Sequence, residues 1–91
     1  MTRYADFPDE LQHLIDELEQ EGFGIVYGAI GESDRPAFIA EQGETIVRVE
    51  DWTQTWAFTL RDPDRPDYDD TWAYPRRVRG EVLEWLDDFE A

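Results

Sequence analysis

The sequence predicts a single α+β domain in which an N-terminal and a C-terminal helix pack on one face of a three- or four-stranded antiparallel meander (order α-β-β-β-β-α). Three observations predict this fold. Apolar residues recur at helical spacing near both ends of the 91-residue chain, β-branched and aromatic segments separated by turn residues fill its middle, and no internal repeat divides it. Helices that cover one face of an antiparallel sheet form a common two-layer arrangement. We therefore expect residues 1–91 to fold as one domain.

The first helix is expected to run from about Pro8 to Glu21. Its apolar residues fall three and four positions apart, which places them on one face of a helix. They are Phe7, Leu11, Leu14, Ile15 and Leu18. Proline is tolerated in a first helical turn, and Gly22 can adopt the left-handed conformation that often ends a helix.

The middle of the chain is expected to begin with three strands. The segment Gly22–Ile30 is rich in β-branched and aromatic residues, although its glycines weaken a strand or mark a bulge. Residues 31–36 have the chemistry of a turn. Ala37–Glu41 and Thr45–Glu50 follow as two short strands, and the glycine-bearing loop at residues 42–44 between them is typical of a hairpin.

The next strand is expected over Trp52–Leu60, where residue types alternate. Alternation with a period of two places every second side chain on the same face of a sheet. One face would carry Trp52, Gln54, Trp56, Phe58 and Leu60. We expect that face to be core. The threonine-rich face is only mildly polar, which leaves open a homodimer that covers the opposite face of the sheet.

Residues 62–70 are expected to form an acidic, proline-rich loop. Two prolines remove backbone donors and the carboxylates favour solvent, so this run fits neither a helix nor a central strand. The second helix is expected from Pro75 to about Glu90, because apolar residues recur at three, four and seven positions. They are Val78, Val82, Leu83, Leu86 and Phe89.

Charge is the most informative property of the composition. The chain has 23 aspartates and glutamates but eight basic residues, all arginine, so its net charge is −15 and its isoelectric point is near 4.1. Such a surface is repelled by nucleic acid and by anionic membranes, so we expect no direct binding to either. The lysine-free, acidic composition resembles that of proteins from salt-accumulating halophiles. In molar salt the Debye length falls to about 3 Å, so we expect folding to depend on salt.

Two kinds of segment are missing from the sequence, and so is cysteine. No window of about 18 apolar residues occurs, and the N-terminus lacks an apolar stretch behind a basic start. We therefore expect a cytoplasmic protein. Cysteine is absent, so disulfides and thiolate zinc sites cannot stabilise the fold, and packing around the aromatic residues has to supply the stability.

The acidic loop raises the hypothesis of a calcium site, because hard cations bind several converging carboxylates. The candidate ligands are Asp62, Asp64, Asp67, Asp69 and Asp70. Their spacing departs from the EF-hand template, since Asp67 stands where the turn needs a glycine and Ala73 where a bidentate glutamate is required. We therefore expect a solvated loop and no metal.

Three arginines cluster in the first turn of the expected second helix: Arg76, Arg77 and Arg79. The helix macrodipole is positive there, so these cations lie at the unfavourable end. Three explanations stay open, namely ion pairs with nearby aspartates, a bound phosphate or other anion, and a contact with an acidic patch of a partner. We favour the ion pairs, with Asp67, Asp69 or Asp70 as the acids.

Aromatic side chains near the acidic loop raise the hypothesis of a stacking platform for sugars or bases. The candidates are Trp52, Trp56, Trp72, Tyr68 and Tyr74. Charge repulsion disfavours bases, and the alternation around Trp56 and Phe58 is typical of a core strand. Trp72 and Tyr74 lie outside that pattern. Together with the arginine cluster, they are candidates for an exposed patch that contacts an anion or a partner.

Residues suited to catalysis are sparse. His13 is the sole histidine and falls off the apolar stripe of the first helix, and Ser33, the sole serine, has no histidine or cysteine near it in sequence. Gly24, Gly28 and Gly31 lack the lysine and the spacing of a phosphate-binding loop. We therefore expect no enzymatic activity and no cofactor.

Three classes of function stay open. We favour a small acidic, non-enzymatic interaction or regulatory domain of a halophilic cytosol with a protein partner, because surface charge explains solubility more often than activity. The alternative is a DNA-mimic or immunity-type inhibitor that offers carboxylates to a basic nucleic-acid-binding protein. A small enzyme or ligand-binding domain built on the arginine cluster is the third. A mimic would gather its carboxylates on one face, whereas here they occur in every third of the sequence.

Overall fold

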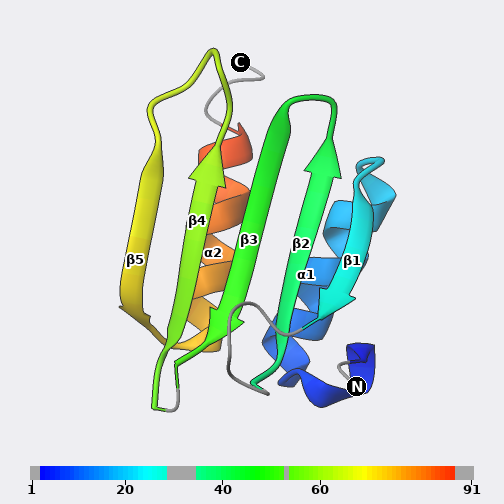
Figure 1. Cartoon of the computed structure of the whole chain (residues 1–91), viewed down its shortest axis with the longest axis vertical. Helices are drawn as coiled ribbons and strands as arrows, with labels where there is room; N and C mark the ends of the chain where they lie inside the picture. Colours follow the sequence, from blue (N-terminus) through cyan, green and yellow to red (C-terminus); the bar gives the residue numbers. More distant parts are fainter. Residues whose placement is uncertain (1–2, 29–34, 53, 88–91) are drawn as a thin grey trace.

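The computed structural model describes residues 3–28, 35–52 and 54–87, and within these residues an antiparallel sheet packs against two α-helices (Figure 1). In chain order the elements are a short 3-10 helix (Tyr4–Asp6), α1 (Asp9–Gln20), β1 (Gly24–Gly28), β2 (Ala37–Gln42), β3 (Thr45–Asp51), β4 (Trp56–Arg61), β5 (Tyr68–Ala73) and α2 (Pro75–Asp87). Each strand pairs antiparallel with the next, and both helices lie on one face of this meander, so the predicted fold class is confirmed. The predicted element ends at Ile30 and Glu90, and Phe89, lie outside the described residues.

The sheet has one more strand than the three or four predicted, because the described residues form five. The additional strand, β5, begins inside the run predicted to be a loop, so the loop ends at Asp67 and Tyr68 starts the strand. Pro63 and Pro66 both precede it. An edge strand needs a partner on one side only, so it accepts charged residues that a central strand would not. Asp69 is such a charged residue, and its side chain is largely exposed.

The first helix ends where the sequence predicts. Gly22 has a φ of 98°, in the left-handed region that favours glycine. The side-chain amide of Gln42, at the end of β2, donates to the Glu21 carbonyl over 2.8 Å, and a Cβ atom on Gly22 would displace that amide. The helix begins at Asp9, so Pro8 lies just before the helix and not inside its first turn.

The strand with alternating residue types begins later than predicted. Three of its side chains face the helices and are buried, as the alternation predicts: Trp56, Phe58 and Leu60. Trp52 is 50% exposed and Gln54 is exposed too, which corrects the prediction that they belong to the core face. The backbone N–H of Trp52 donates to the Thr55 carbonyl over 2.9 Å, so the chain turns there between β3 and β4.

The core lies between the sheet and the helices and contains the apolar stripes of both helices. Its buried members include Leu11, Leu14, Ile15 and Leu18 of α1, Val78 and Val82 of α2, and Phe38, Val47, Val49, Phe58 and Leu60 of the sheet. Phe7, just before α1, packs among three aromatic rings. Its ring centroid lies 5.4 Å from that of Phe38, 5.9 Å from Trp56 and 6.1 Å from Tyr27. This aromatic cluster fastens the start of α1 to the sheet.

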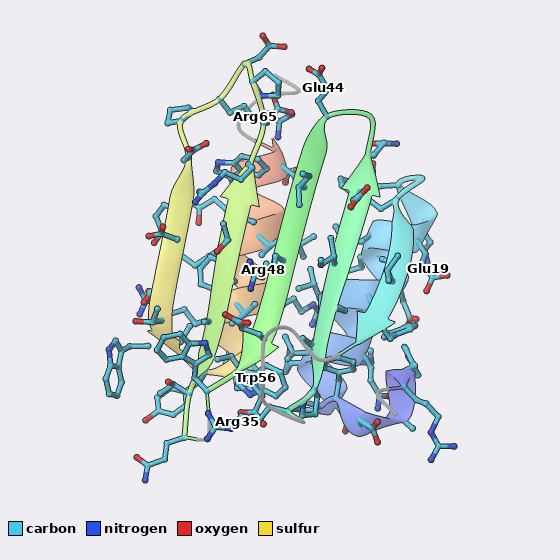
Figure 2. The ribbon with its side chains drawn as sticks, in the orientation of Figure 1. Glu19, Arg35, Glu44, Arg48, Trp56 and Arg65 are labelled. Carbon is cyan, nitrogen blue, oxygen red and sulfur yellow. The ribbon has the colours of Figure 1, made fainter. Side chains whose placement is uncertain are left out.

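The other face of the sheet carries no helix in the described part of the chain (Figure 1, Figure 2). Its side chains form rows across the strands, because directly paired residues point to the same face. One row is Val26, Ile39, Arg48, Thr59 and Asp69, and a neighbouring row is Glu41, Ile46 and Arg61. Val26 is 63% exposed and Ile46 is 37% exposed. We name the surface formed by these rows the open face.

Candidate functional site

A β-bulge in β5 lies at one end of the sheet. The pairing of β4 with β5 shifts between Trp56 and Phe58, so that Thr71 and Trp72 together stand opposite Ala57. An extra residue in an edge strand bends the strand and changes the direction of the neighbouring side chains. Bulges also protect a sheet edge from pairing with other chains, which is the purely structural explanation for this one.

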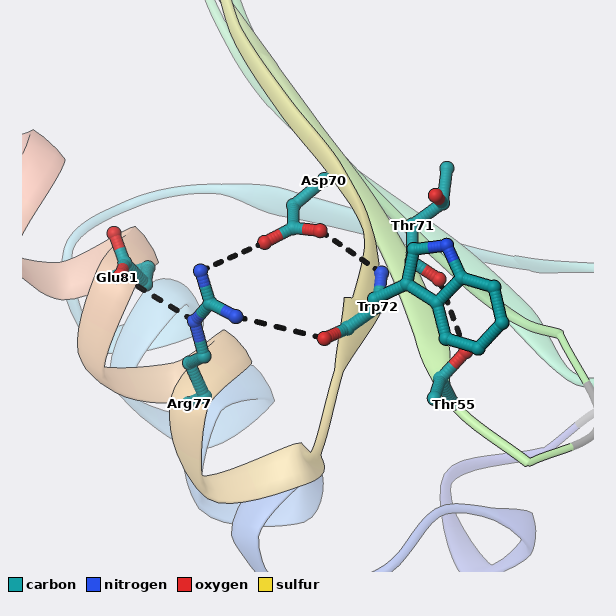
Figure 3. A network of polar contacts seen from close by, with 6 residues as sticks. All are labelled: Thr55, Asp70, Thr71, Trp72, Arg77 and Glu81. Carbon is teal, nitrogen blue, oxygen red and sulfur yellow. Dashed lines mark hydrogen bonds and ion pairs between the residues drawn. The ribbon is translucent and has the colours of Figure 1, made fainter.

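Polar contacts from α2 and from the β3–β4 turn hold the bulge (Figure 3). One carboxylate oxygen of Asp70 lies 2.9 Å from the Arg77 guanidinium, and the other accepts the Trp72 N–H over 2.9 Å. Arg77 also donates to the Trp72 carbonyl over 3.5 Å. On the β4 side, the Thr55 hydroxyl donates to the Thr71 carbonyl over 2.9 Å. The backbone of Trp72 is therefore held at both its N–H and its carbonyl.

Arg77 is positioned by carboxylates from two elements. Besides Asp70 of β5, Glu81 lies one turn further along α2, with its carboxylate 3.6 Å from the Arg77 Nε. The charge of Asp70 raises the pKa of the Arg77 guanidinium above its usual value, so the group stays a cation. The structure thus brings Arg77 onto one of the aspartates that the sequence offers as its partner.

The bulge and the residues after it expose two large aromatic side chains. Trp72 is 73% exposed and Tyr74 is 70% exposed. Trp52, which is half exposed, lies at the same end of the sheet, because the end of β3 pairs with the start of β4 and the start of β4 pairs with the end of β5. The structure therefore places both Trp72 and Tyr74 on the surface and adds Trp52 to them.

Two arginines that form no salt bridge with any described residue lie at this end as well. Arg76 is exposed in the first turn of α2, directly after Tyr74 and Pro75. Arg35 is exposed just before β2, whose start pairs with the end of β3, and Figure 2 places it at the same end of the sheet as Trp56. We name the set of Trp52, Trp72, Tyr74, Arg35 and Arg76 the aromatic–arginine end.

Arg79 does not fold back onto the acidic loop, in contrast to the interpretation favoured from the sequence. Its guanidinium lies 3.0 Å from Glu10 and forms a hydrogen bond with Glu17, so it joins α2 to α1. The hydrogen bonds that Arg79 donates, to Glu17 first and then to Glu10, raise the pKa of its guanidinium above the usual value. The reason for the difference is the packing of the two helices, which brings a residue 69 positions away in sequence into contact. Arg79 therefore has a structural role.

The aspartates considered for calcium do not converge on one centre. Asp67 and Asp69 face Arg61 of β4 at 3.7 and 3.8 Å. Asp62, at the start of the run, accepts a hydrogen bond from the Thr45 hydroxyl, which lowers the pKa of its carboxyl group. Among the described residues, no group of three histidine, cysteine, aspartate or glutamate side chains is placed to hold a metal ion.

The remaining residues considered for chemistry or for stacking lie apart from one another. His13 is exposed on α1, and Ser33 lies outside the described residues. Trp56 is part of the core, and the ring of Tyr68 stacks on that of Phe58 with centroids 5.6 Å apart. The stacking candidates with freely accessible rings are therefore those of the aromatic–arginine end.

Arg35 is not among the site residues predicted from the sequence. No local pattern marks it, because it joins the other residues only through the pairing of β2 with β3.

Strand β5, which was not predicted from the sequence, does have a local signal. Aromatic and β-branched residues are frequent between Tyr68 and Tyr74, which favours a strand.

Comparisons with protein-family models, with curated proteins and with solved structures find no match to this chain. In the described part of the chain, neither helix is long and apolar enough to cross a membrane. The aromatic–arginine end is therefore interpreted from its own geometry.

We expect Arg77→Ala to loosen the bulge without unfolding the domain. The change removes the ion pair with Asp70 and the hydrogen bond to the Trp72 carbonyl, so local opening becomes easier. Amide hydrogen exchange at Trp72 and Ala73, followed by NMR, should become several-fold faster. Arg76→Ala is the matched control, because it removes a cation from the same helical turn. Unchanged exchange in the Arg77 variant would contradict the role of these contacts.

Proposed function

We propose that this chain is a small, acidic, non-enzymatic interaction domain of a salt-rich cytosol, and that it binds a protein partner through the aromatic–arginine end. The observation that carries the proposal is the exposure of Trp72 and Tyr74 on a backbone held by Asp70 and Arg77. Large aromatic side chains gathered at one exposed place mark interaction surfaces, whereas single exposed apolar residues are ordinary.

The residue types of this end support a protein contact. Tryptophan, tyrosine and arginine are the residues most enriched among those that dominate binding energy at protein interfaces. A backbone that is fixed before binding lowers the entropic cost of association. Arg35 and Arg76 add cations with no salt bridge to a described residue. The partner surface is therefore expected to combine an apolar pocket with carboxylates.

The chemistry of the same groups supports binding in preference to catalysis. An arginine guanidinium stays protonated at physiological pH, and an indole N–H can only donate a hydrogen bond. Neither group can move a proton to and from a substrate near neutral pH.

The distribution of carboxylates supports a solvent role for the acidity. Exposed carboxylates occur on both helices, on an edge strand and in two connections: Asp16 and Glu19 on α1, Glu44 in the β2–β3 turn, Asp64 in the β4–β5 loop, Asp69 on β5 and Glu84 on α2. A phosphate mimic needs its charges aligned on one face, so this arrangement favours salt adaptation. At molar ionic strength, like charges spread in this way repel one another only over about 3 Å. The cytoplasmic location forms part of the same proposal.

The test is capture of a partner from an extract of the source organism by the immobilised domain. We expect Trp72→Ala/Tyr74→Ala to reduce the amount of captured partner about tenfold or more, as loss of interface hot spots does. Tyr4→Ala is the matched control, because Tyr4 is an exposed aromatic residue in the segment before α1, at the opposite side of the molecule from β5 (Figure 1). The control should capture the partner as the wild type does.

Equal capture by the double variant and the wild type would overturn the assignment of the binding surface. Capture of a basic nucleic-acid-binding protein that is indifferent to the double substitution would favour the DNA-mimic alternative, because the contact would then involve the carboxylates elsewhere on the surface.

A further inference from the structure

One row of the open face carries an acid, an apolar residue and a base on three neighbouring strands. Glu41 of β2 pairs with Ile46 of β3, and Ile46 pairs with Arg61 of β4, so Ile46 lies midway between the two charged residues. Glu41 is exposed and has no salt bridge to a described residue. Arg61 has two long contacts, 3.7 Å to Asp67 and 3.8 Å to Asp69, and its side chain is 42% exposed. Both charged groups are therefore accessible to a second molecule.

Such a row is complementary to its own copy. Consider two copies whose open faces meet, with a two-fold axis between them that runs parallel to β3 and passes over Ile46. This rotation places β2 of one copy opposite β4 of the other. Glu41 of each copy then faces Arg61 of the other, and the two Ile46 side chains meet at the axis. Every contact in a two-fold interface occurs twice, so one acid–base match supplies two ion pairs.

The neighbouring rows contribute less to the same rotation. Ile39 and Thr59 flank β3 in one row, and Ala37 and Ala57 flank it in the next. The rotation therefore places Ile39 opposite Thr59, whereas Ala37 and Ala57 are already buried in the single chain and add no contact. In the outer part of the first row the rotation sets Val26 of β1 opposite Asp69 of β5, which is the one poorly matched contact of that row apart from Arg48.

A two-fold axis across the strands, through Arg48, fits less well. It would set Glu41 and Arg61 opposite alanines and Ile46 opposite Glu50. Charges that lose water without gaining a partner are costly, so this arrangement is disfavoured. Arg48 meets its own copy under either axis, and Glu50, 3.4 Å from it in the same chain, offsets its charge. The axis along β3 therefore gives the better match of charges between the two copies.

We propose that two copies of this chain associate through their open faces, about a two-fold axis along β3, with reciprocal Glu41–Arg61 ion pairs around Ile46. Aligned packing of two sheets is a common arrangement in β-sandwiches. The apolar contribution comes from Ile46, which is 37% exposed in the single chain and meets its own copy at the axis. The row of Glu41, Ile46 and Arg61 lies at the opposite end of β3 from Trp52, so either proposal can fail without the other.

The balance of charge on the open face supports this choice of partner. Two arginines and two carboxylates stand there, Arg48 and Arg61 with Glu41 and Asp69, and Glu50 lies beside Arg48 in the next row. The whole chain has 23 acidic residues and eight basic ones, so most of its surface would repel a second copy. The open face is an area where two such acidic chains can approach each other at low electrostatic cost.

Charge exchange tests the pairing. We expect Glu41→Arg and Arg61→Glu each to weaken self-association about tenfold or more, because each places like charges face to face at two symmetric positions. An equimolar mixture of the two variants should form a heterodimer, since opposite charges then meet at both positions. The double variant Glu41→Arg/Arg61→Glu should self-associate as the wild type does.

The measurement is sedimentation velocity at the lowest KCl concentration at which circular dichroism shows every variant folded. Glu19→Arg on α1 is the matched control, because it makes the same change of charge at an exposed position away from the sheet. It should leave self-association close to that of the wild type. A wild-type chain that stays monomeric up to about 1 mM would overturn the proposal. A mixture without a heterodimer, or a control that weakens association as much as Glu41→Arg does, would overturn it as well.

Discussion

Replacing Phe7 with alanine is expected to lower the free energy of unfolding by about 3–5 kcal/mol, as such changes at buried phenylalanines do. Phe7 is buried and its ring contacts those of Phe38, Trp56 and Tyr27. It also precedes α1, so the substitution both opens a cavity in the core and releases the start of the helix from the sheet. A domain of this kind has about 5–15 kcal/mol of stability in total, so the variant should be close to the limit of folding.

Denaturant unfolding at about 2 M KCl, where the carboxylates are screened, measures this loss by tryptophan fluorescence. Phe38→Ala should cause a loss of similar size, because it removes a ring from the same cluster. The control is Trp72→Ala, which removes a larger side chain from an exposed position and should change stability by about 0.5 kcal/mol or less. Equal losses for the Phe7 and Trp72 variants would contradict the cluster as the anchor of α1.

Lowering the KCl concentration is expected to unfold the wild-type chain. The net charge of −15 is carried by only 91 residues. The Debye length grows from about 3 Å at 1 M salt to about 10 Å at 0.1 M, so repulsion between carboxylates then reaches from one element to the next. The ion pairs of Arg77 and Arg79 gain strength at low salt, but eight arginines cannot balance 23 carboxylates. Self-repulsion of that size destabilises a compact state.

Far-ultraviolet circular dichroism should therefore show a cooperative loss of structure as KCl falls from about 2 M to about 0.05 M. The control is a triple variant, Glu19→Gln/Glu44→Gln/Glu84→Gln, which removes three exposed charges from α1, the β2–β3 turn and α2. It should stay folded at lower KCl than the wild type. A wild-type chain with the same thermal midpoint at both ends of this range would contradict salt adaptation.

The helices and the central strands could be predicted because their signals are local. The stripe from Leu11 to Leu18 lies within one helix, and Gly22 and Gly43 both adopt the positive φ values that their places at the end of a helix and in a hairpin turn require. Alternation also located the buried side chains of β4. It failed at Trp52 because alternation in the sequence continues through a hairpin turn as readily as through a strand.

Strand β5 was not predicted, because the loop-like residues in and before it outweigh its aromatic and β-branched residues, and its stabilising contacts are distant in sequence. Its aspartates and the prolines before it are typical of a loop, whereas pairing with β4 and the contact of Asp70 with Arg77 hold it as a strand. The partners of the arginines depend on tertiary packing in the same way. Trp72, Tyr74 and Arg76 were recognisable as exposed candidates, but Arg35 joins them only once β2 and β3 are paired.

The salt dependence of the partner complex distinguishes binding through the aromatic–arginine end from binding through carboxylates. Burial of aromatic surface is not screened by salt, so a complex formed through the aromatic–arginine end should persist as KCl rises from about 0.2 M to about 3 M, wherever the domain is folded. A complex held by carboxylates against a basic partner should weaken steeply over that range, as contacts between phosphates and cations do. We expect a partner that stays bound at high KCl and is lost with Trp72→Ala/Tyr74→Ala. A partner that is released as KCl rises and ignores the double substitution would contradict it.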